Sequence, residues 1–257
     1  MSTEVSTGPM TETSPRFKAR IAGVLYLIII IAAPFAEVFV RGRLVVYGDA
    51  AATATNILAH EQLYRLAGAA DLITFTCDAA VALIFYELLK PVSRSLSLFA
   101  AFFRLLYVAI VGVNTLNHFA PLVLLGGARF LSAFKTDQLQ ALALVSLSLH
   151  GTGYNIGLVF FGFHCLLIGY LISRSAFLPR ILGVLMAIAG LCYLTNSFAN
   201  LQSPPLQDYL YPYILLPSGV AELSLCLWLL VKGVNAQRWK EQASAAGEFP
   251  ARESRRL

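Results

Sequence analysis

The sequence predicts an all-α membrane protein, a bundle of six transmembrane helices with short interfacial helices on the outer side. Composition gives the first indication, because 58% of the 257 residues are hydrophobic and only 13% are charged. Soluble domains are about 25% charged, so half that share indicates lipid as the solvent. The second indication is that apolar stretches of about 20 residues, the length that crosses a bilayer core, recur along the chain.

The expected spans are joined by short connections and nearly fill the chain, which leaves no room for a soluble domain of ordinary size. They cover residues 20–40, 64–89, 96–125, 151–173, 178–199 and 211–233. Together they predict a membrane domain at 16–235, preceded by a disordered cytoplasmic tail at 1–15, where Ser, Thr, Glu and Pro dominate. A basic cytoplasmic tail is expected at 236–257.

Two outer connections are predicted to form short helices. The segment 48–60 offers Asp49 as an N-cap and continues with good helix formers until His60. The segment 136–150 repeats this plan and ends at His150. This second segment could instead extend the fourth span.

Lysine and arginine are distributed unevenly between the two sets of connections. The N-terminal tail, the connections after spans 2 and 4 and the C-terminal tail hold 13 of the 19. The opposite connections hold Arg41, Arg43, Arg65, Arg129 and Lys135, and Arg104 lies inside a span. Basic residues favour the cytoplasmic side, so we expect both termini in the cytoplasm of the cell membrane.

The net charge of +5 does not indicate a nucleic-acid partner, because the basic residues flank apolar spans instead of gathering on one element. The partner that composition predicts is the lipid bilayer. No Walker A, GxGxxG, GxSxG or CxxCH motif is present, so neither a nucleotide nor another cofactor is expected. The oligomeric state is left open by the sequence.

Four titratable residues on four different spans are predicted to share a layer near the middle of the membrane. Counted from the cytoplasmic anchors, they lie about 15–18 Å deep at a helical rise of about 1.5 Å per residue. They are Asp78, Arg104, His164 and Glu222. Charges at this depth are rare and face the bundle interior, so an Asp78–Arg104 ion pair is expected. Asp71 lies on the same helical stripe as Asp78.

This midplane layer allows two interpretations. It could bind or move a small solute, ion or lipid, which is the function that we favour from the sequence. It could also be a structural lock that only sets helix register. A structural or regulatory membrane protein without any ligand therefore remains an alternative.

A second polar layer is predicted near the outer face. His60, His118 and His150, together with Glu37 or Asp71, are ligands of the types that bind zinc. A zinc-activated water there would make an intramembrane metal-dependent hydrolase, the second alternative function. The sequence lacks an HExxH motif, so it favours no enzyme class.

Several segments resemble a known family. They are Ala19–Leu27 (ARIAGVLYL), Gly48–Ala50, Phe161–Ile172 (FGFHCLLIGYLI) and Phe177–Gly183 (FLPRILG). They are similar to a bacterial membrane family known as domain of unknown function 4386, and the resemblance covers about residues 15–235. It implies a multi-pass membrane protein and carries no reaction or site residue.

Overall fold

Helices are the regular secondary structure of the residues that the computed structural model describes, 14–247. Within that range six helices are long and apolar enough to cross a membrane, which confirms the predicted class. They span Pro15–Leu44, Glu61–Leu89, Arg94–Leu125, Thr136–Arg174, Arg180–Gln202 and Tyr213–Val231. Residues 1–13 of the predicted N-terminal tail and 248–257 of the predicted C-terminal tail lie outside the described residues.

The first span consists of α1 (Pro15–Pro34), a π-helix η1 (Phe35–Arg41) and a short turn α2 (Gly42–Leu44). It therefore runs past the end predicted at residue 40. The wider turn begins directly after Pro34, where a proline inside a helix disturbs the regular backbone hydrogen bonds. π-Helical turns are rare and recur at functional sites, and this one contains a buried arginine, Arg41.

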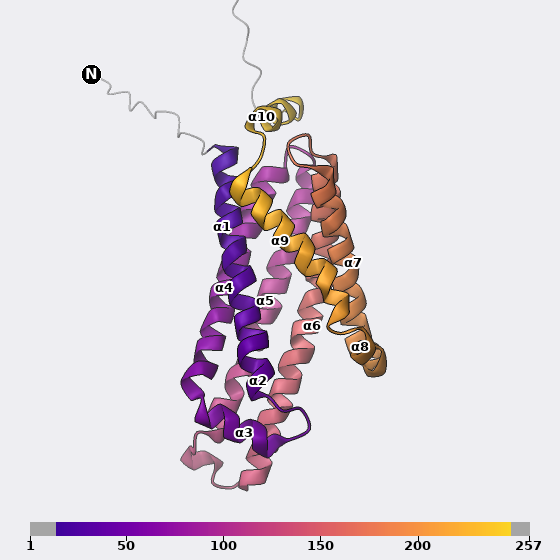
Figure 1. Cartoon of the computed structure of the whole chain (residues 1–257). Helices are drawn as coiled ribbons and strands as arrows, with labels where there is room; N and C mark the ends of the chain where they lie inside the picture. The colour runs from indigo at the N-terminus through magenta and orange to yellow at the C-terminus, as the bar shows by residue number, and fades with distance from the viewer. Residues whose placement is uncertain (1–13, 248–257) are drawn as a thin grey trace, which may run out of the picture.

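The outer end of the bundle, opposite the start of α1, holds the predicted short helix α3 (Ala50–Ala59) (Figure 1). The Asp49 carboxylate accepts a hydrogen bond from the amide of Ala52 at 2.9 Å, which confirms the N-cap. Segment 136–150 is not a separate helix, because α6 runs unbroken from Thr136 to Arg174. The alternative that it extends the fourth span is thus confirmed.

The other helices of the bundle are α4 (Glu61–Leu89), α5 (Arg94–Leu125), α7 (Arg180–Gln202) and α9 (Leu216–Val231). In sequence order, α4, α5, α6 and α7 each pack against the next, and α1 packs against α4. Helix α9 crosses the bundle obliquely in Figure 1 and contacts both α1 and α7. Short 3-10 turns η2 (Arg129–Leu131) and η3 (Tyr213–Leu215) precede α6 and α9.

Two short helices were not predicted. Helix α8 (Pro204–Leu210) follows α7 and begins with proline, which suits a first helical turn. Helix α10 (Ala236–Ala245) forms in the segment predicted as a basic tail, at the same end of the bundle as the start of α1 (Figure 1). The indole of Trp239 donates a hydrogen bond to the carbonyl of Leu88 at 2.8 Å, which fastens α10 to the end of α4.

Candidate functional site

Three of the four predicted midplane residues meet in the core of the bundle. The Arg104 guanidinium donates to Oδ1 of Asp78 from Nε at 2.9 Å and from Nη2 at 2.5 Å. Its Nη1 lies 3.2 Å from Nε2 of His164, whose Nδ1 lies 2.9 Å from the carbonyl oxygen of Ala100. A histidine that donates from Nδ1 to the carbonyl can accept from arginine through Nε2.

Aromatic rings cover the rest of the Arg104 guanidinium. Its central carbon lies 5.1 Å from the ring centre of Tyr26 and 5.4 Å from that of Phe161, within the range of cation–π attraction. Arg104 and His164 are completely buried and Asp78 is 2% exposed. The predicted ion pair is therefore present, and it lies in a packed seam between α4, α5 and α6.

Glu222 does not join this group through any hydrogen bond in the described part of the chain. Its carboxylate accepts instead from the Tyr193 hydroxyl at 2.8 Å, between α9 and α7. The two residues thus link the oblique helix α9 to its neighbour. Shared depth did predict a common layer, but it did not predict a common contact.

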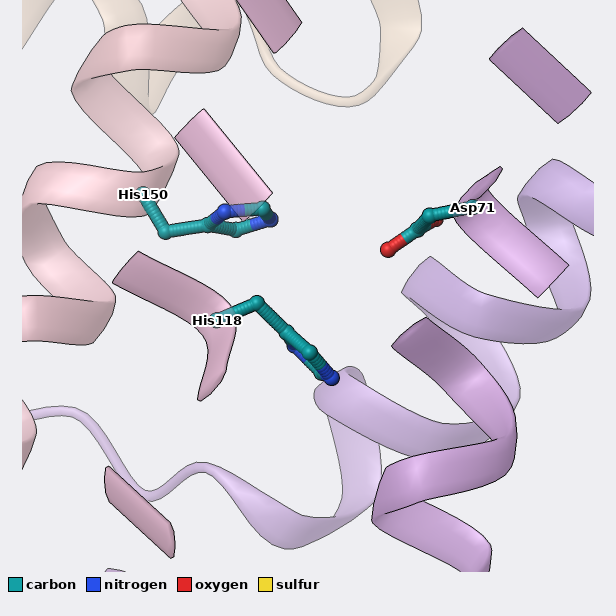
Figure 2. A group of neighbouring side chains, drawn as sticks. All are labelled: Asp71, His118 and His150. Carbon is teal, nitrogen blue, oxygen red and sulfur yellow. The ribbon is translucent and has the colours of Figure 1, made fainter. Parts of the chain in front are cut away.

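The predicted outer layer contains a closer convergence of side chains of metal-ligand types. Asp71 on α4, His118 on α5 and His150 on α6 each offer one potential ligand atom, and the three atoms lie within 4.8 Å of one another. Figure 2 shows the carboxylate and the ring of His150 pointing toward each other across a shared space that His118 borders. All three side chains are buried, at 5%, 0% and 8% exposure respectively.

Backbone contacts orient both histidines in the way that metal ligands are oriented in proteins. Nε2 of His118 lies 3.1 Å from the carbonyl oxygen of Tyr64, and Nδ1 has no hydrogen-bond partner among the described residues. Nδ1 of His150 lies 3.3 Å from the carbonyl oxygen of Asn114 and 3.3 Å from its side-chain amide nitrogen, so Nδ1 donates to the carbonyl in one tautomer and accepts from the amide in the other. Donation to a carbonyl from one ring nitrogen leaves the lone pair of the other nitrogen free for a metal.

The loops and helices around the site hold these rings in place. The hydroxyl of Tyr64 donates to the His118 carbonyl at 2.5 Å, and its ring stacks on the imidazole with centres 4.2 Å apart. The amide of Asn114 donates to the His150 carbonyl at 2.7 Å. Helix α5 is therefore joined by hydrogen bonds to both α4 and α6 at the site.

The positively charged side chain of Arg41 contacts the cluster. Nη1 of Arg41 lies 2.6 Å from Oδ2 of Asp71, and Nη2 lies 3.2 Å from Oδ1. On its other edge, Nε of Arg41 donates to Glu37 at 2.7 Å. The π-helix η1 places this arginine inward with an 8% exposed residue surface, whereas Glu37 is exposed.

The remaining predicted metal ligands lie outside the cluster. His60 is exposed at the end of α3, where Nδ1 contacts the carbonyl of Asn56 in its own helix. Glu37 reaches the cluster only through Arg41. Of the five residues proposed for the outer layer, the structure brings together Asp71, His118 and His150.

Sequence reasoning missed the role of Arg41, which was counted with the residues of the outer connection. The signal that could have found it is the four-residue spacing between Glu37 and Arg41, which places opposite charges on one helical face. The backbone carbonyls that accept from the histidine rings carry no sequence signal, because any residue has a carbonyl.

Comparison with known proteins places the chain in a family. A family profile described as a domain of unknown function, DUF4386, matches residues 21–233. The chain belongs to the DUF4386 family. It is also 27% identical over 156 residues to an uncharacterized protein of Archaeoglobus fulgidus, which covers 61% of this chain and 76% of that protein.

That relative comes from an archaeon, so it gives no support to the expectation that the family is bacterial. No solved structure matches the chain. The DUF4386 family has no assigned activity. The two buried polar clusters are therefore the features of this protein that bear on its function.

Proposed function

We propose that this DUF4386 protein binds a divalent transition-metal ion, of which Zn²⁺ is the natural candidate, in the outer half of its helical bundle. The single observation that carries the proposal is the convergence of Asp71, His118 and His150 within 4.8 Å. Two imidazoles and one carboxylate are a ligand set that zinc uses in proteins.

The chemistry of the ligands supports a metal more than a structural role. A buried nitrogen without a partner, such as Nδ1 of His118, is unfavourable unless a ligand or water satisfies it. The charged groups also leave room for a cation, since Glu37 and Asp71 contribute two negative charges and Arg41 one positive charge. A divalent ion would change the sum from −1 to +1, so an anionic fourth ligand such as hydroxide would balance the site.

The midplane cluster favours the structural interpretation. The Arg104–Asp78 pair has its donors directed at a carboxylate, a histidine and aromatic rings, in a layer that is buried on all sides. A group with satisfied contacts and no exposed face offers no place for a solute. Binding at the outer cluster is thus the form of ligand binding that the contacts favour, and hydrolysis by a metal-activated water stays an untested prediction.

Metal content measures the proposal directly. The protein is purified in detergent, loaded with Zn²⁺ and freed of excess metal. It is then expected to retain about one zinc ion per chain, as measured by inductively coupled plasma mass spectrometry. His118→Ala and the milder His150→Gln are each expected to weaken zinc binding by at least about 100-fold, because losing a ligand exceeds the 10–100-fold effect of losing a supporting contact.

His60→Ala is the matched control, because His60 lies on the same outer side but is exposed and outside the cluster. It is expected to keep the zinc. Wild type, His118→Ala and His150→Gln are each checked for folding by size-exclusion chromatography. Equal retention of zinc by all three folded proteins would contradict the proposed metal site.

The orientation is also part of the proposal. Both termini are expected in the cytoplasm, on the basis of the excess of lysine and arginine in the alternate connections. The start of α1 and helix α10 lie at the same end of the bundle, as an even number of spans requires (Figure 1). This orientation would place the metal site in the half of the bundle that faces away from the cytoplasm.

Reporter fusions check this orientation. A reporter active only outside the cytoplasm is expected to be inactive after residue 240 and active after residue 130, between α5 and α6. A reporter active only in the cytoplasm should give the reverse pattern, and activity of the cytoplasmic reporter after residue 130 would contradict the model.

A further inference from the structure

Arg41 occupies the carboxylate that a metal would need. Its two terminal nitrogens lie 2.6 and 3.2 Å from the two oxygens of Asp71, a bidentate contact that uses both oxygens at once. Both side chains are buried, with 9% and 7% of the side-chain surface exposed. The Arg41–Asp71 ion pair therefore lies inside the bundle and is only weakly screened by water.

A divalent ion and this guanidinium repel each other at such short range. The repulsion between charges a few ångströms apart is large at the low effective dielectric of a protein interior. The ligand atoms, up to 4.8 Å apart, must also approach one another, since zinc lies about 2.0–2.2 Å from each ligand. Asp71 cannot make that movement toward the histidines and keep its present bidentate contact.

We infer that Arg41 is a tethered competitor for the metal and the residue that decides which cations the site accepts. The inference rests on the proposed function, because it describes how the same site is filled. In the metal-free protein Arg41 neutralises Asp71. When a metal binds, it takes the carboxylate and Arg41 withdraws from it.

Glu37 gives the displaced arginine a second partner. Its carboxylate already accepts from Nε of Arg41 at 2.7 Å, on the edge of the guanidinium away from the Nη1 contact with Asp71. Arg41 can therefore leave Asp71 and remain paired with Glu37, so metal binding leaves the buried guanidinium with a carboxylate partner. The wide turn of η1, which holds both residues, is the segment that would move.

This competition predicts selectivity for transition metals. Mg²⁺ and Ca²⁺ are hard cations that prefer oxygen ligands, so they would gain one carboxylate while displacing an arginine. Zn²⁺, Co²⁺ and Ni²⁺ gain the two imidazoles as well. Only the second group has enough differential affinity to displace Arg41.

The test is a double-mutant cycle on Zn²⁺ affinity, measured by competition with a chelator on the full-length protein in detergent. Arg41→Gln is expected to tighten zinc binding by about 100-fold, toward the upper end of typical coupling between sites. Glu37→Gln is expected to weaken it by at least about 5-fold, because the displaced arginine loses its partner. In the Arg41→Gln background the effect of Glu37→Gln should nearly vanish.

Arg41→Gln is also expected to acquire Ca²⁺ binding that competes with zinc, which wild type lacks. Arg41→Lys keeps the buried charge but not the bidentate contact, so it should tighten zinc binding less and provides a second variant if Arg41→Gln does not fold. Arg65→Gln is the matched control, since Arg65 forms the same i,i+4 pair with Glu61 at 2.7 Å on the exposed surface. It should leave zinc affinity unchanged.

Zinc binding that depends on His118 but is equal or weaker in both Arg41 variants would overturn the competition and leave the metal site in place. Absence of His118-dependent zinc from wild type and from both Arg41 variants would overturn the metal site itself. Equal effects of Glu37→Gln in the two backgrounds would overturn the role of Glu37 as the second partner.

Discussion

Arg104→Met alone is expected to destabilise the purified protein by about 3–5 kcal/mol, the effect of breaking a buried ion pair on one side. The variant leaves Asp78 at 2% exposure without its guanidinium, and it removes the donor to His164. Thermal unfolding in detergent, followed by the loss of monodisperse protein, measures the change. Asp78→Leu should have an effect of similar size for the same reason.

The double variant Asp78→Leu/Arg104→Met is expected to recover much of that loss, because replacing both partners of a buried pair with apolar residues can be nearly neutral. The long methionine side chain can fill part of the space between Tyr26 and Phe161. A double variant no more stable than the worse single variant would show that the two residues do not act as a pair.

Gly169→Ala is the second substitution for which we expect a large loss. A methyl group at Gly169 would lie 2.6 Å from the carbonyl oxygen of Gly183 and 2.7 Å from the amide nitrogen of Ala187, both backbone atoms of α7. Neither can rotate away, so α6 and α7 would have to separate. Overpacking of this kind destabilises by about 1–3 kcal/mol, measurable as a lower unfolding temperature in detergent.

Gly151→Ala provides a control on the same helix, because a methyl group there meets nothing within 4 Å. Alanine favours a helix over glycine by about 1 kcal/mol, so this variant should be neutral or slightly more stable. Equal effects at the two positions would show that the close approach of α6 to α7 does not limit stability.

The spans and the Asp78–Arg104 pair could be predicted because both depend on local properties of the chain. Length and hydropathy define a span, and depth along a helix follows from the residue count. A buried charge of each sign at the same depth, on spans joined by a tight connection, strongly favours a pair. The N-cap at Asp49 was predictable for the same reason, since its hydrogen bond to Ala52 is local.

The rest depends on how the helices are rotated and tilted, which residue counts do not give. Glu222 lies on the oblique helix α9, and its carboxylate accepts a hydrogen bond from Tyr193 and not from Arg104. Arg41 is buried within a π-helix that replaces the regular turn after Pro34, and the sequence analysis expected no such change of helix type there.

The candidate metal cluster was predicted only in part, for the same physical reason. The sequence predicted Asp71, His118 and His150 for the outer layer together with His60 and Glu37, since all five have similar depth. Only the rotation of α4, α5 and α6 selects three of them. The short helix that ends at His60 was predicted correctly, but the position of the His60 side chain outside the cluster is a tertiary property.

X-ray absorption at the zinc edge tests the central claim most directly. The zinc-loaded wild-type protein is expected to show nitrogen and oxygen neighbours at about 2.0–2.2 Å and the multiple scattering of two imidazoles. His60→Ala should give the same spectrum, and His118→Ala should lose one imidazole or the metal altogether. A wild-type spectrum without imidazole scattering, or one that is unchanged by His118→Ala and by His150→Gln, would contradict the site.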